Sequence, residues 1–477
     1  MSASRLQTYG AKPRVFILTD ISNEPDDAES LCRYLLYSNQ FETEGLVACT
    51  STWQKDRVCP QDIEKIIDAY ADTVDNLNKH VHPDWPYPSA EQLRGLVRKG
   101  AETYGLTALA DDLPLSPGGE LLLQRITAHI QKPLWVLCWG GTNTLAQVIL
   151  AIDQKYTPED AARIFSRLRV YAISDQDDTG VWIRNNFPMI FYISSVHGWN
   201  HYGMATWTGI SGDKFYGFDQ GGPDFSKWEK QWIKEHIRIG PLGRAYPDYE
   251  FIAEGDTPTF LYLIQNGLGV PEFPSYGSWG GRYVKTDANA SGSNHYSDAV
   301  DRVTGQDGRL YTSNHATIWR WRDAFQNDFA ARMQWTLHGD FDKANHHPVI
   351  SINGAAGIQP VRVEAEAGSK IVLDASKTYD PDAGDTLTFK WWQYKEPSAT
   401  QWLVDAEVAS LDIEKVDEEG RVVEVTLPPA DRCCVDFLGG RKPVVKGQVL
   451  HLILEVTDSG RPPLTSYRRV LIQAVDK

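Results

Sequence analysis

The stretch that decides the fold is RVFILTDISNEPDDAESLCRYLLYS, residues 14–38. It begins with an apolar run, residues 15–19, that is typical of a buried β-strand. Residues 26–38 form an amphipathic segment that predicts a helix. Between strand and helix lies an unusual concentration of acidic and amide side chains, namely Asp20, Asn23, Glu24, Asp26 and Asp27.

The alternation of apolar runs and amphipathic segments continues along the chain. Further strands are predicted at residues 44–50, 133–139 and 168–173, and helices at residues 63–77 and 144–152. Strands separated by helices predict an α/β fold with a mostly parallel sheet covered by helices on both faces. In such sheets ligands bind at the carboxyl ends of the strands, where the polar cluster lies.

The pattern changes near residue 344, after which NHHP (residues 345–348) is typical of a linker. Beyond it, alternating segments separated by turn signals predict an antiparallel, all-β Ig-like sandwich. Its strands are predicted at residues 362–366, 370–374, 386–394, 422–427, 449–457 and 467–474. We therefore expect two domains, residues 1–344 and 345–477.

Composition narrows the classes of partner. The 477 residues carry a formal net charge of -16, which argues against a nucleic-acid polymer as partner because phosphate binding needs clustered basic residues. No apolar run has the length of a membrane span, so no membrane partner is expected. The N-terminal residues, MSASRLQTYGAKP, lack the apolar segment of a signal peptide. The location stays open between the cytoplasm and secretion with a signal absent from this sequence.

The acidic loop has two possible explanations. Carboxylates crowded on a tight loop repel one another unless a cation lies among them, and hard oxygen ligands suit Ca²⁺ or Mg²⁺. Alternatively, Asp26 and Asp27 stabilise the N-terminus of the following helix. That alternative leaves Asp20 and Asn23 unexplained.

Two further motifs lie at the ends of predicted elements. WGGTNT, residues 139–144, ends a predicted strand, and its glycines allow the backbone to approach a ligand. FIAEGDTP, residues 251–258, places Asp256 just before another predicted helix. Each motif taken alone is also compatible with an ordinary turn or helix cap.

Together and in this order, the three motifs resemble those of the nucleoside hydrolases. The resemblance implies Ca²⁺ held by Asp20, Asp27, the backbone carbonyl of Trp139 and Asp256. It also implies that Asp26 binds sugar hydroxyls, and we assign Asn23 and Glu24 to the substrate as well. Asn185 and Asn186, after the strand at residues 168–173, match a segment whose Asn binds sugar hydroxyls in that family.

A closer resemblance is to a branch with nucleoside-hydrolase-like architecture that is often labelled cellulose-binding. The segments EGDTPTFLYLIQNGLGVPEFPSYGSWGGRY and ATIWRWRDAFQNDFAARMQWT carry it, and it covers nearly the whole chain. In the C-terminal part, the loop DPDAGD (residues 380–385) resembles turns of polycystic-kidney-disease (PKD)-like domains and is expected to be either a solvated turn or a Ca²⁺ site. Trp279, in a glycine-rich loop, is the preferred residue for stacking on the substrate.

One departure from the family pattern concerns the leaving group. Nucleoside hydrolases of one major type carry a His immediately before the last Asp, and this chain has Gly255 there. Another acid is then needed for a purine, and the candidates are His197, His201 and Glu254.

The predicted function is a calcium-dependent glycoside or nucleoside hydrolase acting on a small furanoside-like sugar. In this prediction a metal-bound water attacks the anomeric carbon, with Asp20 as the general base. The alternative is a catalytically inactive carbohydrate-binding protein on the same fold, and a third possibility is polysaccharide binding through the sandwich. A homo-oligomer is compatible with the sequence.

Overall fold

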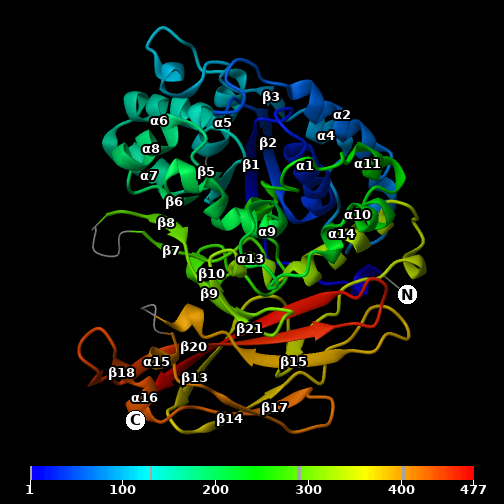
Figure 1. The fold of residues 1–477 in the computed structure, drawn as a ribbon, viewed down its shortest axis with the longest axis vertical. Helices are drawn as coiled ribbons and strands as arrows, with labels where there is room; N and C mark the ends of the chain where they lie inside the picture. The colour runs from blue at the N-terminus through cyan, green and yellow to red at the C-terminus, as the bar shows by residue number, and fades with distance from the viewer. Residues whose placement is uncertain (1–2, 129–130, 287–291, 400–403) are drawn as a thin grey trace.

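The computed structural model describes residues 3–128, 131–286, 292–399 and 404–477. Its largest element is an eight-stranded sheet in the N-terminal part (Figure 1). All neighbouring strands in it are parallel except the edge pair β8 and β7. In spatial order the strands are β3 (Val97–Lys99), β2 (Glu42–Ala48), β1 (Arg14–Thr19), β4 (Leu134–Cys138), β5 (Leu168–Ser174), β6 (Phe191–Ser195), β8 (His295–Asp298) and β7 (Tyr283–Lys285).

Helices cover both faces of this sheet because the side chains of β1 alternate between two apolar clusters. Val15 and Ile17 belong to one cluster, and Phe16 and Leu18 belong to the other. The first is completed by helices that include α1 (Asp26–Tyr37), α2 (Pro60–Ala71), α12 (Thr257–Leu261) and α14 (Arg322–Trp335). The second is completed by α5 (Pro117–Thr127), α6 (Asn143–Lys155), α7 (Pro158–Phe165) and α8 (Asp178–Asn186).

Shorter helices fill the connections. They are α3 (Val74–Leu77), α4 (Ala90–Arg94), α9 (Asp213–Tyr216), α10 (Lys230–His236), α11 (Gly240–Ala245) and α13 (Ala316–Trp319). The helix predicted at residues 63–77 is in fact divided between α2 and α3. The division falls at Thr73, whose backbone N–H and hydroxyl both donate to the carbonyl of Tyr70 and end the first helix.

The C-terminal part is a β-strand-rich region with two facing sheets (Figure 1). One sheet has the order β13 (Val361–Glu366), β21 (Thr465–Val475), β20 (Lys446–Thr457) and β15 (Thr388–Gln393). The other has the order β14 (Lys370–Asp374), β17 (Val422–Thr426) and β16 (Asp412–Lys415). Their inner faces meet in an apolar core that includes Leu373, Val425, Leu452 and Ile472.

Two details of this region differ from the sequence prediction. The pairing is not entirely antiparallel, because β13 runs parallel to β21. β13 and β21 are far apart in the sequence, so no tight turn fixes their relative direction. The strand β16 was not predicted, since its sequence, DIEK, has one apolar residue and gives no clear alternation.

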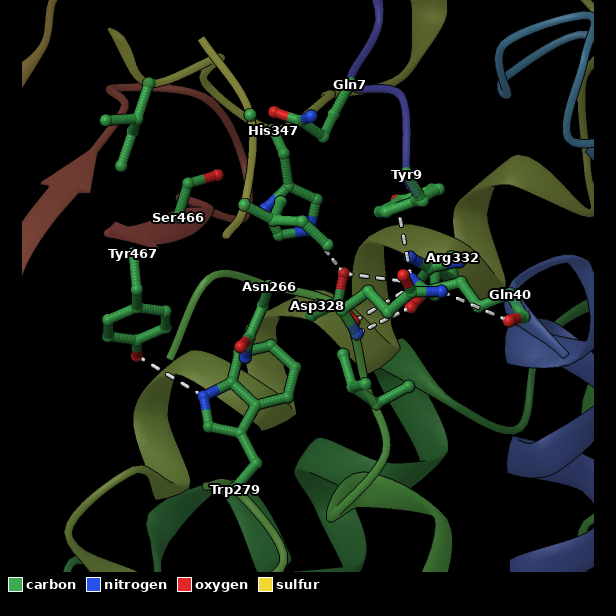
Figure 2. A pocket seen from close by; sticks show the side chains of 15 residues that line it. Gln7, Tyr9, Gln40, Asn266, Trp279, Asp328, Arg332, His347, Ser466 and Tyr467 are labelled. Atoms are coloured by element: carbon green, nitrogen blue, oxygen red, sulfur yellow. Dashed lines mark hydrogen bonds and ion pairs between the residues drawn. The ribbon is translucent and has the colours of Figure 1, made fainter. Parts of the chain in front are cut away.

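The two parts share one apolar cluster at their contact. Ile453 and Tyr467 of the C-terminal sheets belong to the same cluster as Trp279 and Phe325 of the N-terminal part. Figure 2 shows this contact, where the indole N–H of Trp279 donates to the hydroxyl of Tyr467 at 3.4 Å. The cavity left here is only about 30 Å³, so the contact is closely packed.

Candidate functional site

The candidate site lies at the carboxyl ends of the central strands. β1 has β2 on one side and β4 on the other, so the strand order reverses between β1 and β4. Open α/β sheets bind ligands beside such a reversal. The loop after β1 supplies Asp20 and the acidic residues that follow it, and the turn after β4 supplies Trp139.

A cavity of about 640 Å³ opens at this position. One end of it is acidic, with Asp20, Asn23, Glu24, Asp26, Asp27, Glu250 and Asp256 in its wall. The remainder is largely aromatic and apolar and includes Trp53, Trp139, Ile173, Tyr202, Trp207, Phe215, Tyr216, Phe251 and Ile252. The volume and the combination of a polar end with apolar walls are those of a small-molecule site.

Three carboxylates form the centre of the acidic end. Asp26, Asp27 and Asp256 each offer one oxygen, and these oxygens lie within 4.8 Å of one another. Their exposures are 6%, 3% and 1%. Burial, followed by the charges of neighbouring carboxylates, raises the pKa of all three well above the ordinary value. The folded chain thus brings together three carboxyl groups whose ionisation costs free energy.

Asp20 adjoins this trio and is itself 3% exposed. Its charge contributes to the raised pKa of each member of the trio. Burial raises the pKa of Asp20 to about 7, although a hydrogen bond from Ser51 opposes the rise. Gly140 makes room for this side chain, because a Cβ on that glycine would lie 2.9 Å from Asp20.

The helix-cap alternative accounts for only part of the cluster. The N-cap of α1 is Pro25, and Asp26 and Asp27 lie in the first turn, where Asp26 accepts the backbone N–H of Asp27 at 3.0 Å. Asp20 lies outside the helix and takes no part in this. Asp256 does occupy the N-cap position of α12, but its side chain makes no capping hydrogen bond. Its Oδ2 atom is buried and has no hydrogen-bond partner, which is unusual for a carboxylate.

The residues present fit a hard cation such as Ca²⁺. Asp27 and Asp256 are in the trio, and the carbonyl of Trp139, also in the cavity wall, accepts a hydrogen bond from Gln176. The third carboxylate of the trio is Asp26, which was expected to bind sugar, and not Asp20, which was expected to bind the metal. The donor set is oxygen only, and the orphaned Oδ2 of Asp256 offers a free lone pair.

The departure at Gly255 has a steric basis. A Cβ at this residue would lie 2.7 Å from Oδ2 of Asp26 and 2.8 Å from the ring of Trp207. The Trp207 indole therefore occupies the space that a larger side chain at position 255 would need. Of the other proton donors considered, Glu254 is buried in an ion pair with Arg33 at 2.8 Å and is committed to structure.

The two histidine candidates lie outside the wall of the acidic cavity. His197 instead lines an adjoining cavity of about 400 Å³, and its buried Nε2 has no hydrogen-bond partner. Gln176 and Tyr202 line both cavities, so the two spaces share a wall.

Three residues expected to bind substrate are placed elsewhere. Asn185 and Asn186 are exposed at the C-terminal end of α8, and Asn186 donates to the carbonyl of Trp182. The nine residues of α8 span about 13 Å and carry both amides away from the strand ends. Trp279 is 1% exposed and packs against Phe325 and Tyr467, so it belongs to the contact with the C-terminal region.

Other aromatic side chains lie at the cavity, where Trp279 was expected to stack on the substrate. They form an aromatic rim that the sequence did not identify as a group. Trp53 and Trp199 are 51% and 55% exposed, and their rings stack with centroids 5.6 Å apart. Tyr202 packs against both of these rings and against Trp207 inside the cavity. The only signal in the sequence was the abundance of Trp in loops.

The fold and this site define the class: a nucleoside-hydrolase-like α/β protein with a β-strand-rich C-terminal region. The family model for the nucleoside hydrolase-like domain of cellulose-binding Sde182 matches residues 14–283, more than half of the chain. The model for the C-terminal domain of cellulose-binding protein Sde0182 matches residues 370–474. The chain belongs to this family.

A solved structure supports the fold over the whole length. It is a nucleoside hydrolase-related hypothetical protein from Saccharophagus degradans that is associated with carbohydrate metabolism. The chains are 29% identical, the TM-score is 0.77, and the match covers 97% of this chain and 100% of that one. A mouse clustered PcdhgC3 fragment matches 27% of this chain and 34% of its own with 16% identity and a TM-score of 0.16, too low to carry any argument. No curated protein matches the chain.

No helix among the described residues has both the length and the apolar character needed to cross a membrane.

Proposed function

We propose that this chain is a calcium-dependent hydrolase that cleaves the glycosidic bond of a furanoside-like sugar, either an O-glycoside or a nucleoside. The observation that carries the proposal is the buried trio of Asp26, Asp27 and Asp256, which lies beside Asp20 in a cavity with aromatic walls. Membership of a carbohydrate-associated family supports a sugar as the ligand.

Asp27, Asp256, Asp20 and the carbonyl of Trp139 would hold Ca²⁺, and a bound ion would supply a charge that fixes sugar hydroxyls and acidifies a water molecule. Asp20, whose buried carboxylate adjoins the trio, would serve as the general base for that water. Asn23, Glu24 and Asp26, which also line the acidic end, bind the sugar hydroxyls. The aromatic walls exclude water from the remaining faces of the substrate.

The adjoining cavity suits the leaving group. It shares Gln176 and Tyr202 with the acidic cavity, and His197 on its wall has an unpartnered ring nitrogen. A leaving group that extends there meets Asp175 and Arg184, which form an ion pair at 2.6 Å. The site therefore suits a leaving group that is polar at this end.

The test is release of sugar from a panel of nucleosides and aryl furanosides, with Ca²⁺ and after treatment with EDTA. Parent protein is expected to act only with Ca²⁺. Asp20→Asn keeps an oxygen at the same position but removes most of its basicity, so turnover should fall by a factor on the order of 10² or more. The matched control is Asp153→Asn, an exposed carboxyl on α6, which should keep the parental rate.

Gly255 favours one competing function, a carbohydrate-binding protein without turnover. Trp207 blocks a proton donor at that position, so a poor leaving group would receive no proton from there. In that case sugars bind with Ca²⁺ but no substrate in the panel is cleaved. Parental rates in Asp20→Asn, or a parent chain that binds no divalent metal, would contradict the hydrolase mechanism.

A further inference from the structure

A second group of oxygen ligands lies far from the cavity, where the linker meets the C-terminal sheets. Three segments converge there: the loop of residues 380–385 between β14 and β15, the turn that follows β20 at Asp458, and Asn345 of the linker. A cavity of about 490 Å³ lies between them and has Asn345, Asp382 and Asp385 in its wall.

The loop itself brings three carboxylates together. Asp380, Asp382 and Asp385 each offer one oxygen, and these oxygens lie within 4.8 Å of one another. An acidic loop of this kind is often no more than a solvated turn. Here, however, the Oδ2 atom of Asp380 is buried and has no hydrogen-bond partner.

Two almost fully buried side chains next to the loop also have an unused oxygen. Asp458 is 5% exposed and Asn345 is 6% exposed. The amide nitrogen of Asn345 donates to Oδ1 of Asp458 at 3.0 Å and to the carbonyl of Pro462 at 2.8 Å. The remaining oxygens, Oδ1 of Asn345 and Oδ2 of Asp458, have no partner. Because the amide is planar and its nitrogen side is occupied, its oxygen is left for the cavity that Asn345 lines.

The charges of the cluster are only partly compensated. Burial and the neighbouring charges of Asp458, Asp382 and Asp385 raise the pKa of Asp380 to about 7. Asp382 has a partner, since it accepts hydrogen bonds from the backbone and the ring of His346. Arg461 also lines the cavity, as does Lys343, which is paired with Asp340 at 2.8 Å.

We propose that this cluster is a structural Ca²⁺ site that fastens the linker to the C-terminal sheets. Its donors are carboxylate and amide oxygens only, which is the ligand type of Ca²⁺, and water would complete the coordination. They are Asn345, Asp380, Asp382, Asp385 and Asp458. The proposal is independent of the hydrolase function, because none of these residues touches the acidic cavity.

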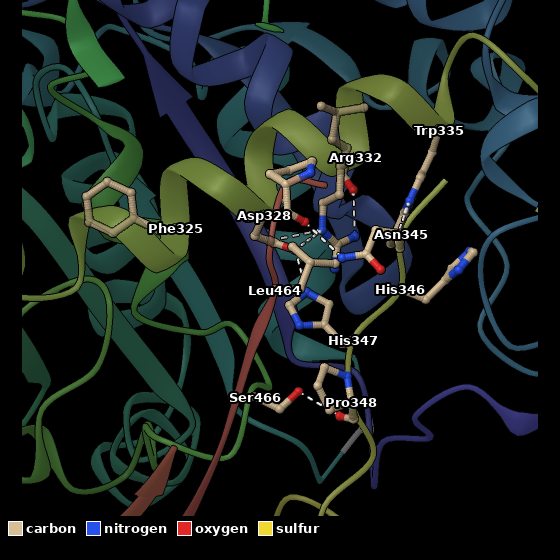
Figure 3. Close-up of polar contacts among 12 residues, drawn as sticks. Phe325, Asp328, Arg332, Trp335, Asn345, His346, His347, Pro348, Leu464 and Ser466 are labelled. Carbon is tan, nitrogen blue, oxygen red and sulfur yellow. Dashed lines mark hydrogen bonds and ion pairs between the residues drawn. The ribbon is translucent and has the colours of Figure 1, made fainter. Parts of the chain in front are cut away.

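Bound Ca²⁺ would act on the contact between the two parts of the chain through the linker. The carbonyl of Asn345 accepts a hydrogen bond of 2.9 Å from the indole of Trp335 on α14 (Figure 3). The next residue, His346, stacks on Trp335 and on Phe341 with ring centroids 5.6 Å and 3.9 Å apart. Fixing Asn345 therefore fixes the residues that join the linker to α14.

The test is the number of Ca²⁺ ions bound per full-length chain, measured by calorimetry or equilibrium dialysis after removal of metal. The double variant Asp380→Asn/Asp385→Asn should bind one ion fewer than the parent. Asp412→Asn, an exposed carboxyl on β16 of the same region, should bind as many as the parent. Asp256→Ala reports on the cavity separately, so failure of one site is distinguished from failure of the other.

A second measurement uses only the parent and correctly folded variants. Trypsin cleaves after Lys343, whose side chain is 59% exposed and lies two residues before Asn345. Ca²⁺ should slow this cleavage several-fold in the parent and in Asp412→Asn but not in the double variant. The proposal would be overturned if the parent and the double variant bound the same number of Ca²⁺ ions. It would also be overturned if Ca²⁺ did not change the rate of cleavage after Lys343 in the parent.

Discussion

Buried carboxylates in two regions of this protein have opposite surroundings. At the contact between the two parts of the chain, Asp301 accepts hydrogen bonds from Arg282 and Arg320, each at 2.7 Å, and these arginines lower its pKa against the effect of burial. In the cavity, burial and the charges of neighbouring acids raise the pKa of Asp26 and Asp256 well above the ordinary value.

The difference separates structural acids from acids of a site. A buried carboxylate that pairs with arginines of the same chain is part of the folded structure and needs no cation from solution. A buried charge that the chain leaves without a cation costs free energy, and this cost is recovered only when a cation comes from solution. The predictions below test this distinction, and the first removes one of the two regions altogether.

The largest effect is expected from removal of the C-terminal region. We propose that the domain boundary lies between residues 344 and 345, and that residues 1–344 fold poorly alone. Trp279, Phe325 and Trp321 would lose the cover of Tyr467, and Trp335 would lose its acceptor at Asn345. The expected result is an aggregated or non-cooperatively melting fragment, measured by solubility and circular dichroism. A soluble fragment that melts cooperatively at the parental temperature would show that the domains are independent.

A single substitution should show the structural role of Asp301. Asp301→Asn leaves two arginines buried with one neutral partner and weakens the 2.5 Å hydrogen bond from the Tyr394 hydroxyl. Breaking such a buried pair costs about 3–5 kcal/mol of unfolding free energy, which denaturant unfolding can measure. The matched control is Asp256→Asn in EDTA, which removes an unpartnered charge and should cost nothing. Equal losses in the two variants would contradict the distinction between the regions.

The pH dependence of metal-free protein tests Asp20. Its pKa in the folded chain is about 7 against an ordinary value of 3.8. The unfolded chain therefore releases this proton at lower pH, and the ionised carboxyl increasingly favours unfolding as the pH rises from about 4 to 7. Asp20→Asn removes the effect, so its stability relative to the parent should grow over this range by at most about 4 kcal/mol and stay constant above it.

The measurement is denaturant unfolding of both proteins in EDTA at several pH values. The difference between them is used because His80 and His315, with pKa values lowered to about 4 by burial, change the stability of both proteins in the same range. Excess Ca²⁺ should shrink the difference, since a bound cation compensates the charge. A variant less stable than the parent at pH 8 in EDTA would argue that Asp20 is a structural acid.

Local patterns predicted the frame that holds the site. The apolar run of β1, the acidic loop and the amphipathic α1 are adjacent in sequence, so the strand, the position of Asp20 and the helix follow from one stretch. The fold class, with its large and mostly parallel sheet, was confirmed. Asn185 and Asn186 do not line the cavity, because they lie at the far end of α8, and the segment match gave no information on the length of that helix.

Contacts between distant segments could not be predicted in the same way. Trp279 and Trp53 both lie in loops, and nothing local indicates that Trp279 is 1% exposed and Trp53 is 51% exposed. The rim combines Trp53 of a loop with Trp199 and Tyr202 of a short 3-10 helix, Trp199–Met204, which is too short to show a period in the sequence. The arginines beside Asp301 come from segments before and after it, so the sequence did not distinguish this acid from those of the cavity.

The smallest expected effect concerns the exposed aromatic rim, where Trp53 is compared with the buried Trp279. Trp53 stacks on Trp199 at the mouth of the cavity, and half of its surface is open to solvent. Trp53→Ala should leave the unfolding free energy nearly unchanged. Binding of an aryl furanoside or an oligosaccharide should weaken by about 0.5–1.5 kcal/mol, the amount that one aromatic pair contributes beyond buried area.

Trp279→Ala should have the opposite pattern. It should leave ligand binding unchanged and cost about 3–5 kcal/mol of unfolding free energy, because its indole is buried between Phe325 and Tyr467. Calorimetric titration of each folded variant, together with its melting curve, measures both quantities. If Trp53→Ala destabilises the fold without affecting any ligand, the rim is a packing feature and the sugar does not reach beyond the acidic cavity.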